Sequence, residues 1–140
     1  MAHEGLPPAE FAFPGPLRDQ LVAAILAGRK TSTSSLLAEY ERGLEPLPRA
    51  GERSVVVDSA GAPVAVIETA EVRIVRMADV DDAFAHEEGE GFVDAAAWRA
   101  AHERFWTSDA FVAELGPPAI ALDDDTQVVC ERFRLIERLG

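Results

Sequence analysis

The sequence predicts an α+β fold, a small curved β-sheet or barrel flanked by helices. Two consecutive strand-like segments lie between residues 54 and 75, another ends the chain, and helical segments lie before and between them. A few strands with helices segregated along the chain favour this architecture over a doubly wound parallel sheet. The chain has 140 residues, 48% of them hydrophobic, which suits one folded domain. We place this domain at residues 11–140, after an N-terminal tail at residues 1–10.

The first part of the domain is predicted to be helical. Residues 17–26 carry apolar side chains at helical spacing, and Gly28 follows where a C-capping glycine is expected. Ser34 or Ser35 is then the expected N-cap of a short helix, LLAEYERG, which ends at Gly43 before two prolines.

The rest of the domain is predicted to contain a β-hairpin, two helices and a final strand. SVVVD and VAVIETAEVRIV form the hairpin, the second strand being long enough to bend, and MADVDDAFA is a short helix. EEGEG is an acidic loop, and Asp94 caps a helix that runs to about Thr107. Residues 117–118 and 123–125 are loop, and TQVVCERFRLIERL is the closing strand.

The charge of the chain restricts its partners. The net charge is −12, and beyond Arg53 eighteen acidic residues face only seven basic ones, whereas residues 18–53 are close to balance. A field this negative opposes tight binding to long DNA, but it tolerates a small nucleoside or a local RNA contact made by the near-neutral first third.

Other bulk features exclude further classes of protein. No apolar run approaches the roughly 20 residues of a spanning helix, and the N-terminus lacks the pattern of a secretory signal. Cys130 is the only cysteine, which excludes an internal disulfide and a cysteine-based zinc site. The aspartates at 123–125 have no neighbours in sequence that would complete a metal site. We therefore expect a cytoplasmic protein with no membrane partner, no metal and no cofactor.

One short stretch concentrates chemically useful side chains. AGRKTSTSS, residues 27–35, contains the only lysine of a chain that has twelve arginines, followed by five consecutive hydroxyl residues. Arginine does not give up its proton in proteins, whereas lysine can do so when desolvation or a neighbouring cation lowers its pKa. A lone lysine among arginines therefore indicates a chemical role for Lys30, although a serine-rich turn also accommodates it.

Gly28, Lys30 and Thr33 match the pattern G-x-K-x-x-T directly after a helix, and this combination resembles the ASCH domain family. The similarity continues through TSTSSLLAEYERGLEPLPRAGERSVVVD, VIETAEVRIV, EGEG…WRAAHERFW and VVCERFRLI, and so covers roughly residues 11–139. The resemblance implies a PUA-like fold with a cleft beside the motif. It also implies one of three activities: RNA binding, ribonuclease activity or, as in some small bacterial members, hydrolysis of N4-acetylcytidine.

The resemblance also implies which residues would act. In the amidohydrolases the motif lysine and threonine work with a glutamate from an acidic loop, which selects Lys30 and Thr33 here. EGFVDAAAW gives the better match for the glutamate, Glu90, and Glu88 is the fallback. The chain is longer than the compact amidohydrolases around residues 36–48 and 105–125, so its substrate can differ.

Two assignments of this chemistry stay open at the level of sequence. Lys30 can be the base that activates the Thr33 hydroxyl, with the glutamate shuttling a proton to the leaving nitrogen. A close ion pair would instead keep Lys30 charged, so that it stabilises the oxyanion while the glutamate is the base. In either case Lys30 and Thr33 must converge across a bend, because residues three apart in a regular strand point to opposite faces.

Four further residues are candidate substrate contacts. Arg29 and Ser32 lie inside the motif, and Tyr40 offers a ring that can stack on a nucleobase. His102 shares a helix face with Trp98 and Phe105, a position that also fits simple helix packing. The leading hypothesis is an amidohydrolase acting on an N4-acetylcytidine-like nucleoside. The alternative is a non-catalytic module that binds RNA or a modified nucleotide, and a ribonuclease ranks below both because the domain offers few histidines.

Overall fold

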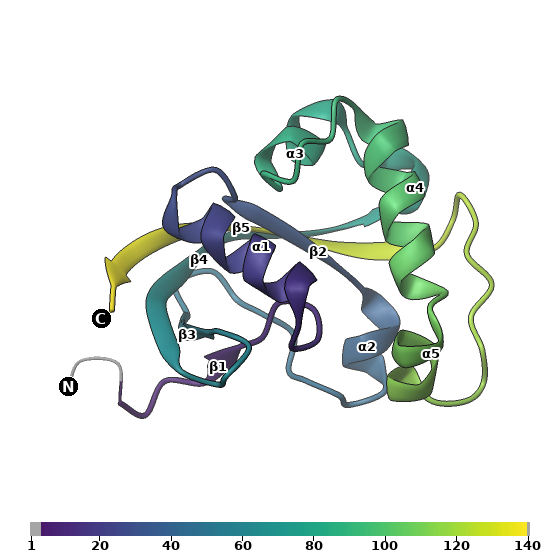
Figure 1. The fold of residues 1–140 in the computed structure, drawn as a ribbon. Coiled ribbons are helices and arrows are strands. Elements are labelled where there is room, and N and C mark those ends of the chain that lie inside the picture. Colours follow the sequence, from purple (N-terminus) through teal and green to yellow (C-terminus); the bar gives the residue numbers. More distant parts are fainter. Residues whose placement is uncertain (1–3, 140) are drawn as a thin grey trace.

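The computed structural model describes residues 4–139, and its organising element is one mixed β-sheet (Figure 1). Its strands are β1 (Pro8–Ala9), β2 (Ser32–Leu36), β3 (Arg53–Val57), β4 (Pro63–Arg76) and β5 (Gln127–Arg138). They lie in the order β1-β3-β4-β5-β2, with β1 parallel to β3 and the other neighbours antiparallel. The predicted α+β class is confirmed, as an open curved sheet and not a closed barrel.

The predicted hairpin is β3 and β4, and the second strand bends as expected. The β4–β5 pairing shifts register between Val66 and Ile67 and again between Thr69 and Glu71. Such irregularities increase the local twist and curve the strand. Pro8 and Ala9, in the segment assigned to the tail, pair with Val55 and Val56 of β3.

Helices pack on the sheet in two groups, each over its own core (Figure 1). The helices are α1 (Pro16–Leu26), α2 (Leu37–Glu41), α3 (Asp82–Glu87), α4 (Ala95–Trp106) and α5 (Asp109–Leu115), with a 3-10 turn at Met77–Asp79. Helix α1 packs Leu21, Val22 and Ile25 against β3, β4 and β5. Helices α3, α4 and α5 cover the other end of the sheet around the fully buried Trp98. No helix in the described part of the chain is long and apolar enough to cross a membrane.

The hydroxyl run gives the largest difference from the sequence-based prediction. Residues 32–36 form the edge strand β2, and the following helix has Leu36 as its N-cap, so the prediction of Ser34 or Ser35 as N-cap is wrong. The Leu36 N–H is satisfied by the Glu39 carboxylate at 2.8 Å. The serine hydroxyls instead bond across space, Ser32 to the Phe84 carbonyl and Ser34 to the Glu88 carboxylate. Long-range partners have replaced the local capping role that serine favours in isolation.

Two helical details also differ from the prediction. Residues 77–87 form a 3-10 turn and then α3, because Asp81 caps a new helix by accepting from the Phe84 N–H at 2.8 Å. Helix α5 was not predicted; Ser108 caps it, and Phe111 and Leu115 anchor it in the core. The Gly28 stop after α1 and the Asp94 cap of α4 are confirmed.

Candidate active site

A cleft of about 540 Å³ opens between the N-terminal segment, β2 with α2, the loop after α3, and the α4–α5 pair. Lys30, Thr33, Glu88, Glu90 and His102 all line it. The residues singled out by the motif and by the acidic loop therefore meet at one concave surface, which is where small-ligand sites form.

The acidic loop is held against the motif by backbone contact. The Thr31 N–H donates to the Glu87 carbonyl at 2.8 Å. Gly89 has φ +69°, and a Cβ placed on it would lie 2.5 Å from the Arg29 carbonyl carbon and 2.6 Å from the Lys30 nitrogen. Only glycine permits both this backbone conformation and this approach. The glycine between the two glutamates thus brings Glu88 and Glu90 to Lys30.

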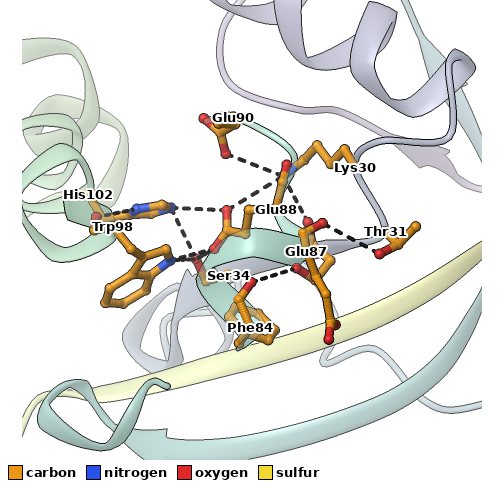
Figure 2. Close-up of polar contacts among 10 residues, drawn as sticks. Lys30, Thr31, Ser34, Phe84, Glu87, Glu88, Glu90, Trp98 and His102 are labelled. Carbon is orange, nitrogen blue, oxygen red and sulfur yellow. Dashed lines mark hydrogen bonds and ion pairs between the residues drawn. The ribbon is translucent and has the colours of Figure 1, made fainter. Parts of the chain in front are cut away.

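Lys30 is buried, with 2% of its surface exposed, and its amine is surrounded by acceptors (Figure 2). Its Nζ lies 2.8 Å from the Ser32 carbonyl oxygen and 3.3 Å from that of Glu88. The carboxylate oxygens Glu88 Oε1 and Glu90 Oε2 lie 3.5 and 3.4 Å away. An ammonium has three donors and no acceptor, so this all-acceptor shell matches the charged form of lysine.

Glu88 is the buried centre of the polar network (Figure 2). Its Oε2 accepts from the Ser34 hydroxyl at 2.7 Å and from the Trp98 indole N–H, while its Oε1 faces Lys30 and His102. Burial alone would raise the pKa of Glu88, but Lys30, His102 and Ser34 together lower it below the usual value. Glu88 is therefore ionised near neutral pH and acts as a buried counter-ion.

The partners of His102 identify its protonation state. Its Nδ1 lies 2.9 Å from the Trp98 carbonyl oxygen, which can only accept. Its Nε2 faces Glu88 Oε1 at 3.4 Å and the Ser34 oxygen at 3.1 Å, whose own proton is directed to Glu88. With the Ser34 proton directed to Glu88, both ring nitrogens face acceptors, an arrangement that imidazolium satisfies. Burial lowers the pKa of His102, but Glu88 outweighs this effect and the net shift is upward.

Glu90 has the opposite character to Glu88. Its side chain is 20% exposed and lines the cleft. Burial raises the pKa of Glu90, Lys30 partly offsets this, and the neighbouring Glu88 charge raises it further. Two adjacent carboxyl groups whose pKa values are driven apart are a pattern of acid–base sites, in which the group with the raised pKa exchanges protons.

The rest of the cleft wall is acidic and aromatic. Its glutamates are Glu10, Glu39, Glu45, Glu88, Glu90, Glu114 and Glu131, against the cations Arg18, Lys30 and His102. Burial raises the pKa of Glu39 to about 7, and burial also raises the pKa values of Glu45 and Glu131. Because protonated carboxyl groups do not repel anions, the negative charge of this wall is smaller than its number of glutamates implies.

The other predicted site residues fall into two groups. Thr33 and Tyr40 line the cleft; the Thr33 hydroxyl makes no hydrogen bond within the described residues, and burial raises the pKa of Tyr40. Arg29 is exposed and Ser32 is fully buried, and neither lines the cleft, because Arg29 precedes the strand and Ser32 points to Phe84. Lys30 and Thr33 share the cleft but not a hydrogen bond.

Sequence reasoning missed Ser34 and Trp98. Both bind Glu88, from β2 and α4 respectively. The available signal was the i, i+4 pair of Trp98 and His102 on one helix face, which places two polar ring atoms on one partner. The bond of Ser34 had no local signal, since Glu88 is 54 residues away in the sequence.

The carboxylates and His102 also form a group that could hold a metal ion. Glu88, Glu90 and His102 offer ligand atoms within 4.8 Å of one another. Lys30, however, already supplies a positive charge to both carboxylates, and His102 Nε2 carries a proton toward acceptors. A metal ligand needs a deprotonated ring nitrogen, so this set fits the lysine cation better than a metal.

The raised pKa of His102 gives a test of this network through stability. Protonated His102 stabilises the folded protein fully below the usual pKa of 6.5, and this contribution is lost as pH rises through the raised folded pKa. We expect His102→Gln to lower the free energy of unfolding most at acidic pH and to flatten its dependence above pH 6.5. His86→Gln is the control, because His86 is exposed and its ring bonds, among the described residues, to the Val93 carbonyl alone. Urea unfolding across pH measures both; equal slopes in the two variants would contradict the assignment.

The fold and the site define a small α+β domain with a lysine–carboxylate cleft beside the G-x-K-x-x-T segment. The model of the ASCH domain matches residues 10–137, so the chain belongs to the ASCH domain family. This confirms the family resemblance seen in the sequence, and with it the PUA-like type of fold.

Solved structures agree with this membership. A protein from Enterococcus faecalis V583 is similar at 29% identity and TM-score 0.78, covering 94% of this chain and 77% of its own. An ASCH domain from Lactobacillus crispatus JV V101 is 30% identical with TM-score 0.73, covering 92% and 79%. An ASCH protein from Zymomonas mobilis shares the fold alone, at 10% identity and TM-score 0.52 over 95% and 73% of the two chains. The search of the curated proteins found no match.

Proposed function

We propose that this protein is an amidohydrolase that removes the acyl group from an N4-acetylcytidine-like nucleoside. The observation that carries the proposal is the Lys30 ammonium between two carboxyl groups whose pKa values are shifted in opposite directions, at the wall of a cleft. Amide hydrolysis needs a charge that stabilises an oxyanion and a group that accepts and then returns a proton. Lys30 and Glu90 supply these two functions.

The steps follow from these roles. Glu90 takes a proton from the attacking hydroxyl, for which Thr33 is the candidate, and the oxygen adds to the amide carbon. The ammonium of Lys30 stabilises the resulting oxyanion, and Glu88 keeps that ammonium charged and in place. Glu90 then returns the proton to the N4 nitrogen, the C–N bond breaks, and the nucleoside amine leaves. Water then gives a proton to Glu90 and adds to the acyl carbon, and Glu90 returns that proton to the Thr33 oxygen as the ester C–O bond breaks and the carboxylic acid leaves.

The charge of the cleft favours an uncharged substrate. The wall has seven glutamates against one lysine, one arginine and one histidine, and even with burial favouring protonation of four of these glutamates it offers no excess of cations to a phosphate. We therefore propose a free nucleoside as the ligand, in preference to RNA or a nucleotide.

The proposal predicts which side chains turnover requires. We expect the purified protein to convert N4-acetylcytidine to cytidine, and Glu90→Gln to lower kcat by about 10²- to 10⁴-fold, the usual contribution of a general base. Because the pKa of Glu90 is raised, kcat/KM should increase with pH through a value above 4.5 in the wild type. Chromatography of substrate and product measures the rate.

A matched pair of threonine variants tests the hydroxyl. Thr33→Val should abolish turnover, whereas Thr31→Val should leave it unchanged, because the exposed Thr31 hydroxyl faces the Glu87 carbonyl and does not line the cleft. Turnover unchanged in Thr33→Val would assign the attack to water. Absence of turnover on a panel of N4-acylated cytidines, together with binding of RNA oligonucleotides, would favour the binding module.

A further inference from the structure

We propose that Phe13 and Phe105 form an aromatic clamp that holds the planar ring of the ligand in the cleft. Phe13 lies on the segment before α1 and Phe105 on α4, and both line the cleft. Their ring centroids are 5.9 Å apart with an interplanar angle of 30°. That the ring is a nucleobase rests on the proposed function; the clamp itself rests on the geometry that follows.

The backbone that presents Phe13 is held by a buried arginine. Arg18 has 3% of its surface exposed, and its guanidinium donates to the carbonyls of Phe11 at 3.1 Å and Ala12 at 2.8 Å. Ala12 has φ +58°, the only positive φ of a non-glycine residue in the described part of the chain. Strained backbone of this kind persists where surrounding contacts enforce it, and it gathers at ligand-binding segments. Here it turns Phe13 away from the core and toward α4.

The two rings differ in freedom. Phe105 is the next-to-last residue of α4 and packs on Phe111 of α5, with ring centroids 5.5 Å apart. Phe13 has 37% of its surface exposed, and its one aromatic partner among the described residues is Phe105. One wall of the clamp is therefore rigid, and the other is a side chain that can change rotamer.

The two rings are in contact, so the clamp is closed and has to open to take a ligand. An aromatic ring stacked between two others needs about 3.5 Å on each side, or about 7 Å between the outer rings. With centroids 5.9 Å apart and planes at 30°, the two rings are in contact, so Phe13 has to swing away by about the thickness of one ring, roughly 3.5 Å, to admit a ligand. Rotation of one half-exposed side chain is enough for such a shift.

The clamp lies in the same cleft as the polar site. Phe11, two residues before Phe13, has its ring centroid 5.9 Å from Lys30 Nζ and packs on Phe133. Phe105 is one helical turn from His102, which contacts Glu88. A planar ring between Phe13 and Phe105 thus lies, together with its substituents, in the same cleft as the Lys30–Glu90 pair.

Equilibrium binding tests the clamp apart from catalysis. In a Glu90→Gln background, calorimetry with N4-acetylcytidine should show about tenfold to hundredfold weaker binding for Phe13→Ala, the usual effect of losing one base–aromatic stack. Phe13→Tyr should keep the affinity. Leu17→Ala is the matched control, because Leu17 also lines the cleft and is 42% exposed but has no ring. Uridine should lose affinity in Phe13→Ala, whereas 5,6-dihydrouridine, whose ring is puckered, should already bind weakly to the parent and change little.

Each outcome separates the clamp from the proposed hydrolase. Binding that depends on Phe13 without any turnover by the wild type supports the clamp and removes the hydrolase. Turnover and affinity that are unchanged in Phe13→Ala, equal losses in Phe13→Ala and Leu17→Ala, or no nucleoside binding at all, would overturn the clamp. Thermal unfolding of each variant confirms that the fold is intact.

Discussion

Lys30→Met is expected to destabilise the folded protein by about 3–5 kcal/mol and to abolish amide hydrolysis. Lys30 and Glu88 form an ion pair whose side chains are each 1% exposed, and removal of one partner leaves the other charge buried. The loss is this large because Glu90 and the Ser32 and Glu88 carbonyls also lose their donor. Urea unfolding gives the free energy, and turnover of N4-acetylcytidine gives the activity.

The pH dependence of this loss identifies its cause. In the wild type the pKa of Glu88 is lowered, so its ionised form adds stability above the usual pKa of 4.5, and this is lost as pH falls through the lower folded value. Without Lys30, the buried Glu88 prefers to be protonated. The penalty of Lys30→Met should therefore be largest near neutral pH and shrink on acidification. A penalty independent of pH would point to lost packing and not to charge.

Lys30→Arg separates the two chemical roles of the lysine. If Lys30 were the base, arginine would abolish activity while the fold stayed intact, because guanidinium does not give up its proton. The all-acceptor surroundings of Nζ favour the oxyanion role, in which arginine keeps the charge and loses only geometry. We expect Lys30→Arg to be folded and to retain a small activity with the pH dependence of Glu90. Combining Lys30→Met with Glu88→Gln should recover part of the lost stability, since the unpaired charge is then removed.

The elements with a strong local pattern could be predicted from the sequence. Helix α1 with its Gly28 stop, the β3–β4 hairpin, the Asp94 cap of α4 and the last strand each follow from periodicity and capping within about 15 residues. The hydroxyl run could not be predicted in this way, because the partners of Ser32 and Ser34 lie at Phe84 and Glu88. Long-range hydrogen bonds made an edge strand from residues whose local preference is a turn or a cap.

The candidate site was predictable in its residues but not in its connections. The resemblance selected Lys30, Glu88 and Glu90, which the structure brings together. The different roles of Glu88 and Glu90 depend on their burial and on His102 and Trp98, two side chains of α4 that contact Glu88. Neither burial nor this network has a local sequence signal. Thr33 lies in β2, where its side chain points to the opposite face from those of Ser32 and Ser34. The sequence did not reveal this strand, and so it did not reveal that Thr33 and Lys30 share no hydrogen bond.

Gly89→Ala is expected to separate the acidic loop from Lys30 and to lower kcat/KM by about 10²-fold or more, since displacements near 1 Å cost catalysis that much. The new Cβ would meet the Arg29 carbonyl carbon and oxygen at 2.5 Å, which are backbone atoms and cannot rotate away. The loop has to shift, and the contacts of Lys30 with Glu88 and Glu90, at 3.5 and 3.4 Å, are lost with it.

Gly91→Ala distinguishes this clash from simple backbone strain. Gly91 also has a positive φ, +87°, but a Cβ there meets nothing within 4 Å. Both variants carry the strain of a left-handed alanine, about 1–2 kcal/mol, and only Gly89→Ala also displaces the loop. We therefore expect similar turnover in Gly91→Ala and the wild type, and a further loss of stability in Gly89→Ala. The NMR titration of His102 reports the geometry independently of activity: its pKa should stay raised in Gly91→Ala and fall in Gly89→Ala, because Glu88 moves away. Equal effects of the two variants on this pKa would show that strain, and not the approach of Gly89 to the Arg29–Lys30 peptide, holds the site together.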